Sequence, residues 1–182
     1  MIKDFALFLK QLHGVSIKDV LDVGLGPQVF DRTIKDNILK QIDYRVELVQ
    51  LDSDLVDYKN QIKELCKLLQ SVTLDKSQLV LVHGDLYSKH LFFENKKLSG
   101  VIDWGDVGLN HPVVDLAALY SIFPKDSHSS FYGIYGSVSE EVKLYAKFLA
   151  VHSALACLEF AKSHDDAQLE TEAIYSLFLL FE

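Results

Sequence analysis

Two histidines and two aspartates that could act together chemically lie in the stretch VHGDLYSKHLFFENKKLSGVIDWGD, residues 82–106. His83, Asp85 and His90 precede a short apolar run, and Asp103 follows the next one. Two carboxylates that approach each other repel unless a cation or an exchangeable proton lies between them. These residue types therefore favour a divalent metal site, or a site where a carboxylate takes the proton of a substrate hydroxyl.

The pattern around these residues predicts a small β unit. QLVLV predicts a short strand, and HLFFENKKLSGVIDW predicts a β-hairpin whose connection at ENKK has four or five residues. Because a hairpin returns the chain to its starting point, Asp103 should come back beside the Asp85–His90 loop. Asp85 comes first, His90 follows five positions later, and Asp103 lies beyond the hairpin. This order resembles that of a kinase catalytic loop followed by its metal-binding segment.

Helical periodicity fills the rest of the chain. We expect helices that begin after Ser16, Ser53 and Ser139, which are suitable N-cap residues. Before them, IKDFALFLKQLHG predicts a helix that stops at a glycine. The helical pattern runs from Val29 to about Leu69, interrupted at QLDSD. After Pro112 we expect helices over 113–123, 139–164 and 166–181, with a looser stretch around the glycines at 133 and 136.

These elements predict a mainly α chain with a small β-hairpin insertion (α+β). We expect a single domain over residues 1–182, helical over 1–78 and again over 111–182. The strand, loop and hairpin that hold the ionisable residues occupy 79–110. A chain of this length can bury a sizeable core.

The segment HGDLYSKHLFF…LSGVIDWGDVGLNHPVVDLA resembles the aminoglycoside and macrolide phosphotransferase family. The family pattern HGDLxxxN…IDWxxxxxGxPxxDLA is met from Val82 to Ala117, with GLNHP in place of a more usual turn. FLKQLHGVSIKDVLDVGL is similar to the family's first helix after the hinge, FLxxLH. The resemblance implies the C-terminal lobe of a protein-kinase-like fold, with the N-terminal lobe absent because the chain begins at that helix.

The resemblance also implies roles for individual residues. Asp85 is the catalytic base toward the acceptor hydroxyl, and Asp103 is a metal ligand. His83 holds the catalytic loop together, and Asp115 bonds to the backbone of that loop from below. His90 stands where the family has Asn, so three roles stay open for it: metal ligand, hydrogen-bond donor to phosphate, or packing.

Three further residues are candidates for phosphate, metal or substrate contacts, and each also has a simpler interpretation. Lys89 could touch a γ-phosphate or be an exposed loop lysine. Trp104 could contact the ligand or belong to the core, and Asp106 could face the metal or lie in a solvated turn. The resemblance implies Mg²⁺ and ATP as cofactors and a small-molecule hydroxyl as substrate. The acidic run EFAKSHDDAQLETE could bind a cationic substrate, but a solvated helix face explains the same residues without a function and is preferred.

Three explanations for the missing lobe stay open. The chain is a fragment of a longer kinase, it assembles with a separate N-lobe chain, or it is a relic that binds a ligand or partner without catalysis. An uncovered upper surface would also favour a homodimer. The glycine-rich GLGPQ lacks the third glycine of a phosphate loop. His83, Asp85 and His90 could instead serve a metal-assisted phosphoesterase, whereas no GxSxG motif supports a serine hydrolase.

Composition narrows the class of protein further. The formal net charge of -8 disfavours a nucleic-acid partner, which would need a basic face. No run approaches about 20 uninterrupted apolar residues, so we expect no membrane span. Cys66 and Cys157 lie far apart without a CxxC spacing, and we expect reduced core thiols in a cytoplasmic protein. His13, His152 and His164 have no partner pattern and are expected to be surface or core histidines.

Overall fold

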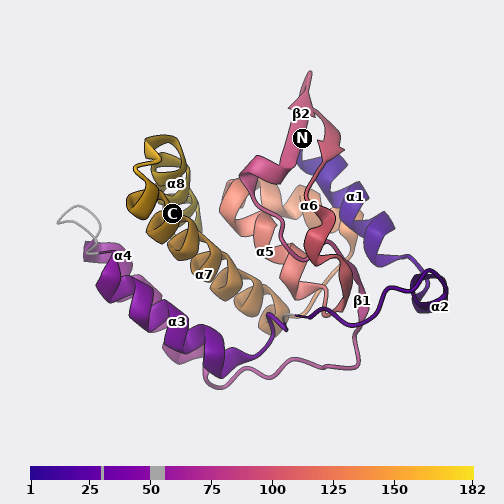
Figure 1. Ribbon diagram of the computed structural model, residues 1–182, viewed down its shortest axis with the longest axis horizontal. Helices are drawn as coiled ribbons and strands as arrows, with labels where there is room; N and C mark the ends of the chain where they lie inside the picture. The colour runs from indigo at the N-terminus through magenta and orange to yellow at the C-terminus, as the bar shows by residue number, and fades with distance from the viewer. Residues whose placement is uncertain (30, 50–55) are drawn as a thin grey trace.

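The computed structural model describes residues 1–29, 31–49 and 56–182 (Figure 1). The prediction of a mainly helical chain with a small β part is confirmed. The helices are α1 (Ile2–His13), α2 (Ile17–Asp22), α3 (Lys35–Leu48), α4 (Val56–Leu69), α5 (Val113–Ile122), α6 (His128–Tyr135), α7 (Glu140–His164) and α8 (Ala167–Phe181). The strands are β1 (Val80–Val82), β2 (Leu91–Glu94), β3 (Lys97–Val101) and β4 (Gly108–Asn110).

The helix α7 is the centre of the helical part. It packs against α8, α5, α3 and α4, with α3 and α4 on one side and α1, α5 and α6 on the other (Figure 1). Its small and apolar residues, such as Ala150, Leu155 and Leu158, are buried against these neighbours. Of the described helices, α7 alone has the length and composition that could cross a membrane, and more than half of that apolar window is buried inside the molecule.

The helix boundaries agree with the predicted caps where they can be compared. The hydroxyl of Ser16 accepts the N–H of Asp19, and that of Ser139 accepts the N–H of Val142. The predicted cap Ser53 lies outside the described residues. The predicted helical start at Val29 is wrong, because α3 begins only at Lys35.

A local hydrogen bond explains the late start of α3. The Asp31 carboxylate accepts the backbone N–H of Thr33 at 2.8 Å and also its hydroxyl. Such an Asx turn offers the backbone an alternative to the helix. The segment before Lys35 is therefore a loop, and it passes close to the loop that holds Asp85.

The prediction of a looser stretch around Gly133 is also wrong, because this stretch contains the helix α6. Phe131 of α6 is fully buried and its ring lies 5.9 Å from that of Phe5 in α1. This packing outweighs the low helix propensity of a glycine. Gly136, with φ 120, ends the helix.

The β part consists of two antiparallel pairs. β2 and β3 form the predicted hairpin, which projects from the helical part (Figure 1). Its connection has two residues, Asn95 and Lys96, both with positive φ, so the predicted connection of four or five residues is wrong. A two-residue turn of this kind matches the twist of the strands on either side.

The second pair joins β1 to β4, with Val80 opposite Asn110 and Val82 opposite Gly108. The segment GLNHP therefore supplies a strand and not only a turn. The glycine-rich segment runs alongside: the N–H of Leu109 donates to Gly26 at 2.8 Å, and that of Gln28 donates to Leu109 at 3.1 Å. A Cβ on Gly108 would lie 2.9 Å from the Gly26 carbonyl oxygen, so only glycine permits this approach.

Candidate active site

A buried carboxylate fixes the backbone of the loop that follows β1. Asp115, in the first turn of α5, is fully buried. Its Oδ2 accepts the N–H of His83 at 2.8 Å, and its Oδ1 accepts the N–H of Gly84 at 2.9 Å. These are the contacts that the resemblance implied for Asp115. Hydrogen bonds to a charged acceptor are stronger than neutral ones, so the two bonds hold the loop firmly.

The same carboxylate has a third partner that the sequence pattern does not reveal. His13, the last residue of α1, places its Nε2 3.1 Å from Asp115 Oδ2 and its Nδ1 2.8 Å from the hydroxyl of Tyr135. The His13 side chain is almost fully buried. His13 therefore ties α1 and α6 to the support of the loop. The signal for this role is its place at the end of FLKQLH.

His83 connects the loop to the end of the hairpin. Its Nδ1 accepts the N–H of Asp85 at 3.3 Å, and its Nε2 lies 2.9 Å from the carbonyl oxygen of Ile102. Because Nδ1 accepts, the ring proton lies on Nε2 and is donated to Ile102. The ring is fully buried, and the indole of Trp104 packs on it with centroids 4.6 Å apart. His83 thus fixes the spacing between Asp85 and the residue after Ile102.

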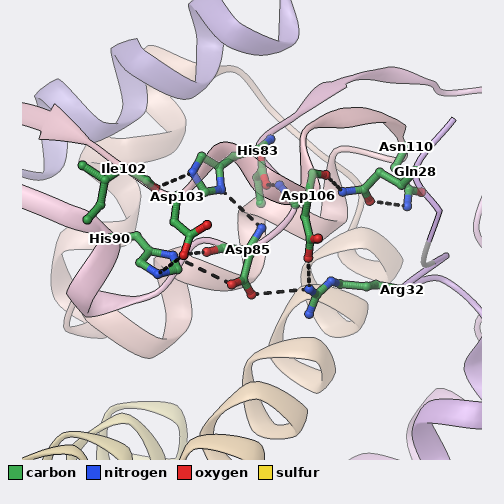
Figure 2. Close-up of polar contacts among 11 residues, drawn as sticks. Gln28, Arg32, His83, Asp85, His90, Ile102, Asp103, Asp106 and Asn110 are labelled. Carbon is green, nitrogen blue, oxygen red and sulfur yellow. Dashed lines mark hydrogen bonds and ion pairs between the residues drawn. The ribbon is translucent and has the colours of Figure 1, made fainter. Parts of the chain in front are cut away.

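That residue is Asp103, and it does return beside the Asp85–His90 loop. The His90 ring contacts both carboxylates: its Nε2 is 3.5 Å from Asp103 Oδ2, and its Nδ1 is 3.9 Å from Asp85 Oδ2 (Figure 2). The His90 side chain is buried, whereas those of Asp85 and Asp103 are 42% and 62% exposed. The structure therefore gathers three of the predicted site residues at one end of the β unit.

The orientation of the His90 ring is fixed by the backbone. Its Nδ1 lies 2.7 Å from the carbonyl oxygen of Asp85, which can only accept. The Nδ1 proton is therefore donated to that oxygen, and in the neutral ring the Nε2 lone pair faces the Asp103 carboxylate. Asp103 itself has φ 62 and ψ 64, a left-handed conformation that is uncommon outside glycine. Such conformations are often found at functional sites.

Arg32 is the site residue that the sequence analysis missed. One of its terminal nitrogens lies 2.5 Å from Asp106 Oδ2 and 3.4 Å from Asp85 Oδ1 (Figure 2). It comes from the loop before α3, which the periodicity wrongly assigns to a helix. The only signal in the sequence is that the chain has just two arginines, Arg32 and Arg45.

The three secondary candidates have different surroundings. Lys89 points toward the start of α8, where its Nζ lies 3.3 Å from Asp166 Oδ2. Asp106 is bound by Arg32, so it is not merely a solvated turn residue. Trp104 is half-buried on His83 and donates its indole N–H to the carbonyl of Val101 at 3.1 Å.

The donor set fits a hard divalent cation in part. Carboxylate oxygens are the ligands that Mg²⁺ prefers, and Asp85 and Asp103 both present exposed oxygens on the same side of the site (Figure 2). Within the described ranges, no group of three or more His, Cys, Asp or Glu side chains has the geometry of a metal site. A cation here would therefore need ligands from a bound molecule or from water, as is usual for Mg²⁺ with phosphates.

A pocket of about 340 Å³ opens beside Asp85, between the loop and α7. Two of its lining residues are shifted in pKa by their surroundings. Burial, together with the charges of Arg45 and Arg32, lowers the pKa of His152 to about 4. Burial also raises the pKa of the Cys157 thiol. Both side chains are therefore uncharged near neutral pH.

Comparisons with known proteins agree with the motif. Residues 1–149 match the model of a family described as "Phosphotransferase enzyme family". An aminoglycoside 3'-phosphotransferase of Niallia circulans is 26% identical over 157 residues, which cover 80% of this chain and 56% of that protein. The chain thus spans a little over half the length of this relative.

Solved structures share the fold. A type I macrolide 2'-phosphotransferase has a TM-score of 0.59 and 24% identity, over 97% of this chain and 58% of its own. An aminoglycoside phosphotransferase in complex with GDP and kanamycin has a TM-score of 0.63 and 18% identity, over 97% of this chain and 61% of its own. By its match over residues 1–149, the chain belongs to the phosphotransferase enzyme family.

Proposed function

We propose that the chain is the C-terminal lobe of an ATP-dependent kinase that transfers a phosphoryl group to a hydroxyl of a small molecule. The observation that carries this proposal is that Asp85 and Asp103 both lie within 4 Å of the His90 ring, with side chains that are 42% and 62% exposed. Phosphoryl transfer needs a carboxylate that orients the acceptor and another that holds a metal on the phosphates. The family match supports the same reaction class.

Each residue then has a defined task. Asp85 orients the acceptor hydroxyl and takes its proton as the new O–P bond forms. Asp103, together with the Nε2 of His90, would hold Mg²⁺, which when bound neutralises charge on the nucleotide phosphates. His83 and Asp115 keep the loop in place beneath them. Arg32, the cation nearest to the Asp85 carboxylate, holds it beside Asp106.

Ligand, partner and location are part of the same proposal. We infer that ATP binds chiefly to a separate N-lobe chain or to a part of the protein outside these 182 residues, since the match covers 56% of the curated relative. The surface that such a lobe would cover could instead pair two copies in a homodimer. A soluble enzyme of this kind would act in the cytoplasm, with no membrane or nucleic-acid partner, as the net charge of -8 favours.

Two alternatives lead to different expectations. A non-catalytic relic would bind a ligand or partner but transfer nothing. A metal-assisted phosphoesterase would need more metal ligands than this site has within the described residues. The continuation of the motif to Asp115 also favours the kinase.

The test measures metal binding and turnover separately. Mn²⁺, used as a paramagnetic substitute for Mg²⁺, is titrated into the chain, and Asp103→Asn should weaken its binding about tenfold. The control is Asp126→Asn, a surface change outside the site. ADP release is then measured with added ATP and hydroxyl acceptors, with and without the N-terminal part of the Niallia circulans relative.

Any turnover should fall about 10²–10⁴-fold in Asp85→Asn, as expected for loss of a general base, while the free energy of unfolding stays unchanged. Turnover that survives Asp85→Asn would refute the assignment. Metal binding without turnover in any mixture would favour the relic.

A further inference from the structure

The pocket beside Asp85 is built from four parts of the chain. The loop after β1 supplies Leu86 and Lys89, α7 supplies His152, Ala156 and Phe160, and the start of α8 supplies Leu169. Arg32, from the loop before α3, and Asp85 also line the pocket. An acceptor hydroxyl that approaches Asp85 from this pocket meets its lining, which then decides which acceptors fit.

Charges in the lining are balanced. The two cations are Arg32 and Lys89, and the two anions are Asp85 and Asp166. Lys89 is paired with Asp166 at 3.3 Å. Arg32 lies 3.4 Å from Asp85, but it is 2.5 Å from Asp106, which does not line the pocket. His152 is uncharged near neutral pH. Each lining carboxylate thus has a cation within 4 Å among the described lining residues, and Asp85 shares its cation with Asp106.

The acidic run at the end of α7 and the start of α8 does not supply further anions to the pocket. Glu159 pairs with Arg45 at 2.8 Å, and Glu170 lies 3.8 Å from the Nζ of Lys162. Glu172 accepts the hydroxyl of Ser88 at 2.8 Å. A polycation would have to displace the cations that pair with Glu159 and Glu170, which costs part of the binding energy. The partner of Glu172 is a neutral hydroxyl.

The opposite wall of the pocket is apolar. Phe160 is 52% exposed although it is a large aromatic residue, and it lines the pocket together with Ala156 and the buried Leu169. Its ring is stacked on that of His164 with centroids 3.9 Å apart, which fixes its orientation. A fixed, exposed aromatic face is suited to packing against an apolar or ring-shaped part of a ligand.

We propose that this pocket selects a hydroxyl compound of low net charge with an apolar face, and that it discriminates against polycations. The inference rests on the proposed function, because the hydroxyl is taken to lie beside Asp85. It replaces the cationic substrate that the acidic run suggested.

The experiment compares two probes on the intact chain by calorimetry: phenyl β-D-glucopyranoside, which is uncharged, and kanamycin, which is polycationic. At about 150 mM salt we expect the glycoside to bind at least about tenfold more tightly than kanamycin. Lowering the salt should leave the affinity of the glycoside unchanged. Phe160→Ala should weaken glycoside binding about fivefold.

The matched control is Phe178→Ala, which removes an exposed aromatic ring of α8 that does not line the pocket. It should leave glycoside binding unchanged. Tighter binding of kanamycin, weakened by Asp166→Asn, would overturn the proposal. Failure of the glycoside to bind, or equal effects of the two phenylalanine changes, would overturn it as well.

Failure of this proposal can be distinguished from failure of the proposed kinase function. If kanamycin is preferred, the acceptor class is wrong while Asp85-dependent phosphoryl transfer can still be observed. If no Asp85-dependent transfer occurs, the preference for the uncharged glycoside is still measured directly by binding.

Discussion

The buried cluster of His13, His83 and Asp115 contrasts with the neighbouring open face, which is formed by Arg32, Asp85, Asp103 and Asp106. In the buried cluster, Asp115 accepts two backbone N–H groups and contacts His13, all at 3.1 Å or less. On the open face, Asp103 has one contact at 3.5 Å and a left-handed backbone. The same residue type, aspartate, is used in opposite ways.

The difference indicates where stability and chemistry reside. A buried carboxylate whose partners are all protein groups has no capacity for a ligand, and its loss leaves buried donors unpaired. An exposed carboxylate with long contacts contributes little to folding but keeps its oxygens available. We therefore expect changes in the buried cluster to affect the free energy of unfolding, and changes on the open face to affect binding and turnover.

The largest effect should come from Asp115→Ala. This change leaves the N–H groups of His83 and Gly84 and the ring of His13 without their buried acceptor. We expect a loss of about 3–5 kcal/mol in the free energy of unfolding, measured by urea denaturation. The control is Asp126→Ala, a surface change, which should cost less than about 0.5 kcal/mol. A loss below about 1 kcal/mol for Asp115→Ala would contradict the structural role of the cluster.

The second effect concerns the backbone between the two regions. Gly84 has φ 93, and a Cβ there would lie 2.5 Å from the carbonyl oxygen of Asp106. Gly84→Ala should therefore cost about 2–4 kcal/mol in the free energy of unfolding, since it adds a clash to a strained conformation. Gly133→Ala is the matched control: it lies in α6 with open space around it, and should stabilise the protein by about 0.5–1 kcal/mol. If Gly84→Ala and Gly133→Ala changed the free energy of unfolding equally, the positive φ of Gly84 would not require a glycine.

The contrast also explains what the sequence could predict. The hairpin and the return of Asp103 to His90 followed from local patterns, because apolar runs and turn residues specify a hairpin within a few positions. The buried contact of Asp115 followed only from the resemblance. Arg32 could not be predicted, since its contact with Asp106 joins residues 74 positions apart and depends on where a loop passes. Long-range packing of this kind has no local signal.

The errors in secondary structure have the same origin. The helical pattern around Val29 was periodic, but the Asx turn at Asp31 competed with it. The glycine at 133 suggested a loop, but burial of Phe131 stabilised a helix. In both cases an interaction outside the periodic pattern decided the local structure.

A third, smaller effect is a pH dependence from His152, which lines the pocket beneath the open face. Its pKa is about 4 in the folded chain and about 6.5 in an unfolded one, so between these values the unfolded state binds more protons. The free energy of unfolding should therefore fall as the pH falls from 7 to 5. Urea denaturation at pH 7 and at pH 5 measures this fall. We expect the fall in the free energy of unfolding to be about 1–2 kcal/mol smaller in His152→Gln than in the unaltered chain.

Burial also lowers the pKa of His111 and that of His128. Both histidines are present in the unaltered chain and in His152→Gln. Their contribution cancels in the comparison. An identical pH dependence of the two proteins would mean that the pKa of His152 is the same in the folded and unfolded chain, and that burial does not lower it.

The smallest effect on stability should come from the open face itself. Asp103→Gly relieves a left-handed conformation, so we expect the free energy of unfolding to rise by roughly 0.5–1 kcal/mol. Mn²⁺ binding, measured by calorimetry, should be lost in the same variant because the carboxylate is removed. A rise in stability that accompanies a loss of binding is expected where strain is kept for function.

Lys96→Gly separates the two consequences, because Lys96 has φ 63 in the hairpin turn but lies outside the site. An Asn-Gly turn is favoured between such strands, so this variant should gain a similar stability and keep its Mn²⁺ affinity. If Asp103→Gly instead lowered the free energy of unfolding while Lys96→Gly raised it, the Asp103 carboxylate would stabilise the fold through its contact with His90. The open face would then be structural in the same sense as the buried cluster, and the distinction between the two uses of aspartate would fail.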